Sequence, residues 1–196
     1  MYLVTCGASW VNGDYSWVEE VSEEQNIIST PFLTDDYTDS TTYRMILKDK
    51  FKCDTYTNLA YGGSTNKVQI ELLKDLLKKH KNRDDIIVIF GLLPLEEEKQ
   101  FEEIISLDIE HLFLFNTVCQ QPLPNALFGS KDLLSLISKD DTQVNPKDWN
   151  NCQNYFRKIY KAFKLGLVNL DNHHMTKKAN ATISCMIFNE IKSKII

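Results

Sequence analysis

Short apolar runs alternate along the chain with longer amphipathic segments. The runs that predict strands lie at residues 2–5, 53–59, 86–90, 112–115 and 165–170. The run at 86–90, Ile-Ile-Val-Ile-Phe, is continuous and largely β-branched, which is typical of a strand buried on both faces. This alternation predicts an α/β fold, a three-layer α/β/α sandwich built on a parallel sheet of about five strands.

Apolar residues at helical spacing predict the helices between these runs. The apolar face of one helix consists of Val68, Leu72, Leu73, Leu76 and Leu77. An aromatic-rich helix carries Trp149, Tyr155, Phe156, Ile159, Tyr160 and Phe163. The last helix starts near Thr176 and carries Ala179, Ile183, Met186, Ile187 and Ile191. Ser64 or Thr65 is the expected N-cap of the first of these helices, because a hydroxyl there accepts a hydrogen bond from the first turn.

The size and charge of the chain narrow its class and partners. Its 196 residues predict a single domain over residues 1–196. Lys and Arg number 22 against 27 Asp and Glu, a net charge of −5, which argues against non-specific nucleic-acid binding. No run approaches the roughly 18 apolar residues of a membrane span, and the first residues lack the features of a signal peptide. The five cysteines are odd in number and widely spaced, so we expect reduced thiols and a cytoplasmic origin.

Three polar clusters carry candidate chemistry. In residues 7–13, Gly-Ala-Ser-Trp-Val-Asn-Gly, Ser9 follows the first predicted strand on a tight turn that exposes a hydroxyl. In residues 58–66, Gly63 precedes a helix and can present a backbone N–H, helped by the helix dipole, to a developing oxyanion. In residues 171–174, Asp171 lies three residues before His174 and can orient its imidazole as a base.

Each cluster also has a structural interpretation. The first reads equally as a Gly-Ser loop that caps a helix, the second as an ordinary strand–turn–helix connection, and the third as a solvated entry to a helix. A metal site from Asp171, His173 and His174 lacks a further ligand at the usual spacing, so we expect none. Residues 7–13 are also compatible with the anion loop of a flavodoxin-type phosphate or nucleotide binder, which leaves Asp171 and His174 unexplained.

Taken together, the order of the three clusters resembles the SGNH, or GDSL, hydrolase superfamily over nearly the whole chain. That family has a Gly-Asp-Ser-x-x-x-Gly block near its start, a Gly after the second strand, Gly-x-Asn-Asp after the third, and Asp-x-x-His near the end. Residues 7–13 match the first block with Ala8 in place of Asp, and residues 171–174 match the last. The Gly-Ala-Ser-Trp and Gly-Gly-Ser-Thr-Asn stretches are similar to a variant of the family found among bacteriophage proteins.

The resemblance implies a flavodoxin-like sheet and ester hydrolysis through an acyl-enzyme. Ser9 would be the nucleophile, His174 the base and Asp171 its orienting carboxylate, with the N–H groups of Ser9 and Gly63 as the oxyanion hole. The substrate class would be small esters or acetylated glycans, and no metal or organic cofactor would be needed. Trp10, Tyr61 and Asn66 flank the site and are candidates to line its pocket.

One block departs from the family pattern. After the third strand the chain reads Gly91-Leu92-Leu93-Pro94, so Leu93 stands where the family has the Asn that donates to the oxyanion. The loss of one such donor costs about 10²–10³ in turnover. Asn66 is a candidate substitute. Leu93 also favours a competing interpretation: a structural or glycan-binding module, such as a component of a phage virion, that keeps the fold and has lost activity.

Overall fold

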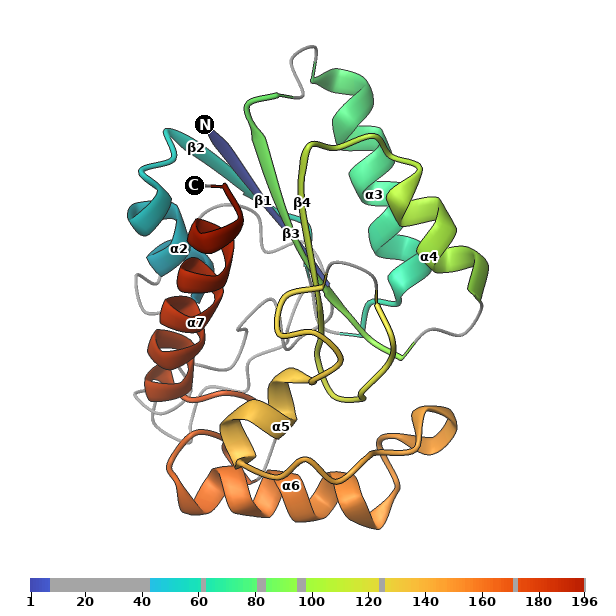
Figure 1. The fold of residues 1–196 in the computed structure, drawn as a ribbon, viewed down its shortest axis with the longest axis vertical. Helices are drawn as coiled ribbons and strands as arrows, with labels where there is room; N and C mark the ends of the chain where they lie inside the picture. The colour runs from blue at the N-terminus through green and yellow to red at the C-terminus, as the bar shows by residue number, and fades with distance from the viewer. Residues whose placement is uncertain are drawn as a thin grey trace, which may run out of the picture.

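Four parallel strands form the sheet at the centre of the part of the chain that the structure describes (Figure 1). This computed structural model describes residues 1–7, 43–60, 63–80, 84–94, 98–123, 126–170 and 173–195. The strands are β1 (Tyr2–Gly7), β2 (Thr55–Asn58), β3 (Ile86–Leu92) and β4 (His111–Asn116), and their order is β2-β1-β3-β4. This order is that of a flavodoxin-like sheet up to its fourth strand.

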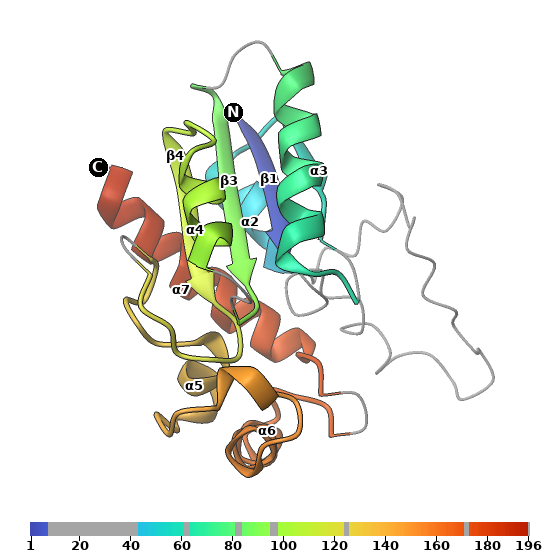
Figure 2. The ribbon, with the colours of Figure 1, turned by 90° about the vertical axis from the view of Figure 1, so that its right-hand side faces the viewer.

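Helices cover both faces of this sheet (Figures 1 and 2). α2 (Tyr43–Phe51) and α7 (Lys177–Ile195) pack together on one face, and α3 (Asn66–Lys79) and α4 (Glu98–Ile105) on the other. α5 (Leu133–Ser138), the short 3-10 helix η2 (Pro146–Asp148) and α6 (Gln153–Lys164) lie beyond the carboxyl ends of the strands. The predicted three-layer α/β/α sandwich is confirmed. Among the described helices, none has the length and apolar character needed to cross a bilayer.

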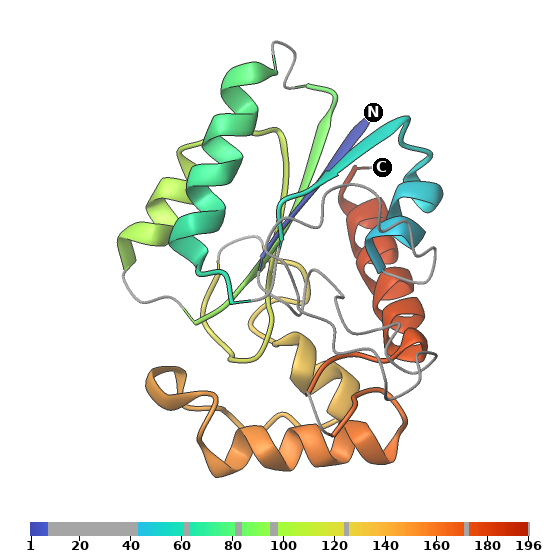
Figure 3. The same cartoon turned by 180° about the vertical axis from the view of Figure 1, so that it is seen from behind.

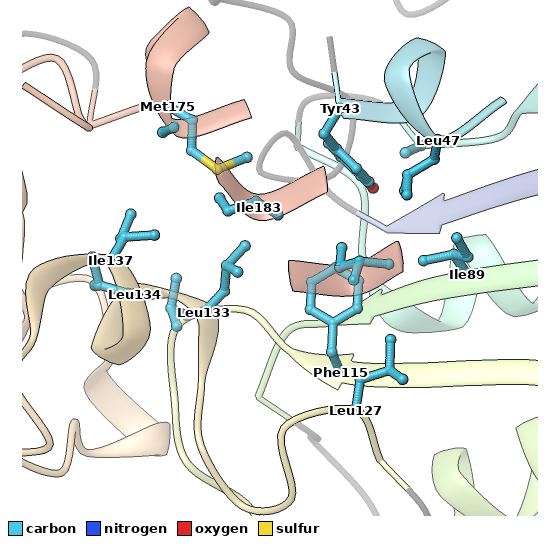
Figure 4. Packing of buried hydrophobic residues seen from close by; sticks show 14 of the residues in the cluster. Tyr43, Leu47, Ile89, Phe115, Leu127, Leu133, Leu134, Ile137, Met175 and Ile183 are labelled. Atoms are coloured by element: carbon cyan, nitrogen blue, oxygen red, sulfur yellow. The ribbon is translucent and has the colours of Figure 1, made fainter. Parts of the chain in front are cut away.

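β3 is buried along its whole length, as its continuous apolar run predicts. Successive side chains of a strand point to opposite faces, so β3 contributes to two separate cores. Ile87 and Ile89 join the cluster beneath α2 and α7, part of which is drawn in Figure 4, and Val88 and Phe90 join the cluster beneath α3 and α4. Both faces of the strand are filled, which explains why it has no polar position.

The predicted strand at residues 165–170 is wrong. Gly166 follows the end of α6 in a left-handed conformation, with φ +68°, and turns the chain out of an extended course. Leu165 is exposed, and within the described residues the segment pairs only through one antiparallel bridge between Val168 and Met175. The apolar run is therefore the connection between α6 and α7.

The predicted aromatic-rich helix is present as α6 and starts later than predicted. α6 begins at Gln153, so Trp149 lies outside it, and Phe156, Tyr160 and Phe163 are 45%, 50% and 41% exposed. The side chains that α6 buries are Tyr155, Lys158, Ile159 and Ala162. Lys158 is thus buried in the same helix as the predicted residues Tyr155 and Ile159.

Lys158 forms a buried ion pair that joins α6 to α5. Its Nζ lies 3.2 Å from Oδ2 of Asp132, and both side chains are fully buried. The hydroxyl of Ser135 bonds to both groups, and Asp132 also caps α5 by accepting the N–H of Ser135 at 2.7 Å. Although Ser, Lys and Asp side chains can perform nucleophilic chemistry, this cluster is closed to solvent and its role is structural.

We expect Lys158→Met to lower the free energy of unfolding by about 3–5 kcal/mol, because it leaves the Asp132 carboxylate buried without its cation. Urea unfolding followed by circular dichroism measures the change. Lys164→Met, an exposed position on the same helix, is the matched control and should cost less than about 1 kcal/mol. Equal midpoints for the two variants would contradict the structural role of the pair.

Candidate active site

The carboxyl ends of the strands meet at one edge of the sheet, the edge at which open α/β folds place their sites. The pairing of β1 with β3 ends with Gly7 opposite Gly91, and that of β3 with β4 ends with Leu92 opposite Asn116. Residues 7–13 follow β1, and the segment with Gly63 follows β2. The sheet thus brings the starting points of two predicted clusters and the Leu93 block to one edge.

Several predicted site residues lie outside the described residues: Ser9, Trp10, Tyr61 and Asp171. The predicted contacts of Ser9 with His174, and of Asp171 with the same imidazole, therefore stay predictions. The structure does describe the other residues named for the site, which are Gly7, Gly63, Asn66, Leu93 and His174.

Gln69 of α3 is fully buried and joins three segments near the strand ends. Its Oε1 accepts the N–H of Gly7 at 2.9 Å, and its Nε2 donates to the carbonyl of Leu59 at 2.9 Å and to Oγ of Ser64 at 2.7 Å. Every polar atom of the carboxamide is thus used. The side chain holds the end of β1, the segment after β2 and the start of α3 at set positions relative to one another.

The hydrophobic pattern of the sequence does not distinguish Gln69 from a surface residue. Its apolar-face prediction placed Val68 toward the core, whereas Val68 is 39% exposed and the buried face is made of Asn66, Gln69, Ile70, Leu73 and Leu77. The spacing of the residues could have indicated this buried face. Asn66 and Gln69 continue the row of Ile70, Leu73 and Leu77 toward the start of the helix. Polar residues in line with an apolar row indicate buried groups with specific partners.

Gly63 begins the turn that leads into α3. Its φ of +75° lies in the left-handed region, and a Cβ built on it would meet nothing within 4 Å. The glycine is therefore required by the backbone conformation and not by lack of space. Thr65 is the N-cap, with its hydroxyl accepting the N–H of Val68 at 3.4 Å, which confirms one of the two predicted caps. Gly63 thus lies exposed just before the positive end of the α3 dipole.

Asn66, the first residue of α3, bonds to the backbone of Leu93 in both directions. Its Nδ2 donates to the carbonyl of Leu93 at 3.0 Å, and its Oδ1 accepts the N–H of Leu93 at 3.1 Å. The carbonyl of Leu93 also accepts a bond from Nε2 of Gln121 at 3.1 Å, while the Leu93 side chain packs against the core beneath α2 and α7. The backbone of Leu93, at the position where the resemblance expects an Asn, is therefore held by carboxamides of other elements.

His173 and His174 lie in the connection between α6 and α7. The bridge between Val168 and Met175 closes this connection. Inside it, the N–H of Asn169 donates to the carbonyl of His174 at 2.8 Å, and the N–H of His173 donates to the carbonyl of Asn169 at 2.9 Å. Main-chain bonds therefore set the path of the backbone at both histidines.

The two histidines have different surroundings. The ring of His173 lies 5.7 Å from the rings of Tyr155 and Phe156, and its φ is +59°. His174 is half-buried and directly precedes Met175, which is 2% exposed and belongs to the core beneath α7. Main-chain bonds and a buried neighbour thus anchor the backbone of His174, the predicted base.

The thiol of Cys6 does not have the properties of a nucleophile, and the described ranges hold no cluster of metal ligands. Cys6, close to Ser9 in sequence, is fully buried beneath α3 and α4, and burial raises the pKa of its thiol well above the ordinary value. A thiol with a raised pKa is a poor nucleophile at neutral pH. Among the described residues no group of three His, Cys, Asp or Glu side chains is placed to hold a metal ion.

Solved structures share this architecture. The psychrotrophic esterase EstA from Pseudoalteromonas sp., inhibited by monoethylphosphonate, aligns with 99% of this chain and 98% of its own, at 13% identity and a TM-score of 0.50. TesA aligns with 98% of this chain and 99% of its own, again at 13% identity and a TM-score of 0.50. A lipase/acylhydrolase from Enterococcus faecalis aligns with 98% of this chain and 96% of its own, at 14% identity and a TM-score of 0.43. No protein-family model and no curated protein sequence matches the chain.

At this identity the first two likenesses establish the fold. The chain has the fold of SGNH/GDSL-type hydrolases, so the resemblance predicted from its motifs is confirmed at that level. Both alignments span nearly the full length of both chains.

We expect Gln69→Leu to lower the free energy of unfolding by about 2–5 kcal/mol. Leucine has a similar volume, but it leaves the buried N–H of Gly7 and the part-buried carbonyl of Leu59 without partners. A buried group without a partner costs about 1–3 kcal/mol. Chemical denaturation measures the effect. Lys67→Leu, on the exposed side of the same helical turn, is the control and should change stability by less than about 1 kcal/mol. A Gln69→Leu protein as stable as this control would show that the carboxamide does not hold the edge together.

Proposed function

We propose that the chain is a serine ester hydrolase that works through an acyl-enzyme. Ser9 is the nucleophile, His174 is the general base, and Asp171 orients the imidazole. The observation that supports this most directly is the single side chain of Gln69, which ties Gly7, two residues before Ser9, to the segment that contains Gly63. A nucleophile and an oxyanion donor must keep a constant separation, and this tie restricts the backbone on both sides.

The reaction follows from these roles. Ser9 Oγ attacks the ester carbonyl while His174 takes its proton, and the N–H groups of Ser9 and Gly63 donate to the oxyanion of the tetrahedral intermediate. The intermediate collapses, the alcohol leaves with the proton from His174, and the acyl group stays on Ser9. Water then attacks the acyl-enzyme with His174 again as base. His174 returns that proton to Ser9 Oγ as the bond to the acyl group breaks, and the carboxylic acid is released. These steps need no metal or organic cofactor.

Small carboxylic esters, including acetyl esters of sugars, are the proposed substrates. EstA, which shares the fold, is an esterase inhibited by a phosphonate. A tetrahedral phosphonate resembles the intermediate of ester hydrolysis, so the same chemistry gives a suitable probe for this chain.

A non-catalytic module, structural or glycan-binding, is the second candidate. Leu93 is the observation that favours it, because the side chain at the position of the family's donor is apolar and packs against the core. The two candidates differ in one measurable property, the reactivity of Ser9.

We expect a fluorophosphonate probe to label the peptide that contains Ser9, and we expect the protein to hydrolyse p-nitrophenyl acetate. Ser9→Ala should abolish labelling, and His174→Ala should slow both reactions by at least about 10³-fold, because the base is lost. His173→Asn is the control: asparagine tolerates a positive φ, so both rates should stay within a few-fold of wild type.

The labelled peptide is identified by mass spectrometry, and unfolding curves confirm that each variant is folded. Equal labelling of wild type and Ser9→Ala would show that the nucleophile is wrong. A folded wild-type protein that neither reacts with the probe nor hydrolyses the ester would favour the non-catalytic module.

A further inference from the structure

The orientation of the Asn66 carboxamide follows from its two partners. The backbone N–H of Leu93 needs an acceptor and the carbonyl of Leu93 needs a donor, so Oδ1 faces the first and Nδ2 faces the second. A carboxamide nitrogen carries two N–H groups. Nδ2 bonds to the carbonyl of Leu93, and its second N–H has no partner among the described residues, although Asn66 is only 5% exposed.

The position of Leu93 relates this N–H to the strand that leads to Ser9. The pairing of β1 with β3 ends with Gly7 opposite Gly91. Leu93 comes two residues after Gly91, and Ser9 comes two residues after Gly7 in the sequence. β3 is the neighbour of β1, the strand that leads to Ser9. The Asn66 carboxamide therefore lies against the end of the strand next to β1.

The start of α3 adds a favourable field. Asn66 is the first residue of a 14-residue helix whose N-cap is Thr65, so its side chain lies at the positive end of the helix dipole. Gly63, the proposed backbone donor, comes three residues earlier in the same turn. A negative charge that develops on a carbonyl oxygen at this point is stabilised by the dipole as well as by N–H groups.

We propose that Asn66 donates its second Nδ2 N–H to the oxyanion and is a further catalytic residue of the esterase. In this proposal a carboxamide at the start of α3 replaces the one that the family pattern has after β3. The bonds of Asn66 to Leu93 hold it next to position 93. This inference rests on the proposed function, because it assigns a donor to the intermediate formed on Ser9. It also explains how an apolar Leu93 is compatible with catalysis.

The test compares kcat and KM for p-nitrophenyl acetate in wild type, Asn66→Asp and Asn66→Ala. Aspartate keeps an acceptor for the N–H of Leu93, and its charge suits a helix start, so Asn66→Asp should fold. It has no N–H to donate. We expect kcat to fall by about 10²–10³ in both variants with KM changed by no more than a few-fold, because an oxyanion exists only after attack.

Gln69→Ala is the matched control, since it removes a second buried carboxamide of α3 that also bonds to backbone groups. Leu93→Asn is then added to each background. A gain of at least about tenfold in kcat over Asn66→Ala, without a comparable gain over Gln69→Ala, supports the proposal, because a donor can be moved to position 93 whereas a structural tie cannot.

A folded Asn66→Asp protein with a kcat within a few-fold of wild type would overturn the inference while the proposed function stood. Loss of probe labelling in Ser9→Ala tests the proposed function separately. A wild-type protein without esterase activity or labelling would overturn both.

Discussion

Two carboxamides of α3 supply hydrogen-bond partners to the backbone groups at the carboxyl edge of the sheet. Where a parallel strand ends, its last peptide groups lose their ladder partners, and a buried group without a partner costs about 1–3 kcal/mol. Gln69 satisfies the N–H of Gly7 and the carbonyl of Leu59, and Asn66 satisfies both backbone groups of Leu93. The ends of β1, β2 and β3 are thus bound to one helix. In the view from behind, α3 lies beside the sheet that these strands form (Figure 3).

This arrangement changes what a side chain at position 93 has to do. With its backbone held by Asn66 and Gln121, Leu93 can direct an apolar side chain toward the core that contains Phe115 and Met175. An asparagine at the same point would lose that packing. A leucine at the position where the resemblance expects an asparagine is therefore consistent with the hydrogen bonds and packing at this edge of the sheet.

The sequence was sufficient where local pattern determines structure. β3 and α7 were predicted because a continuous apolar run and a regular helical row need no knowledge of distant residues. The partners of Gln69 could not be predicted, because Gly7 lies 62 residues away and only the closed sheet brings the two together. The burial of Lys158 in α6 could not be predicted for the same reason: Asp132, 26 residues away, neutralises it, whereas a lysine read alone belongs at the surface.

The two halves of the proposed site depend on different parts of the fold. The half that follows β1 and β2 is set by hydrogen bonds from α3, on one face of the sheet. The half with His174 is set by the bridge at Met175, whose side chain is buried on the opposite face. The sheet is the layer that these two cores share, so its strands determine how the halves are placed. Burial of β3 on both faces is consequently a requirement of the site as well as of stability, since a shift in either core moves one half relative to the other.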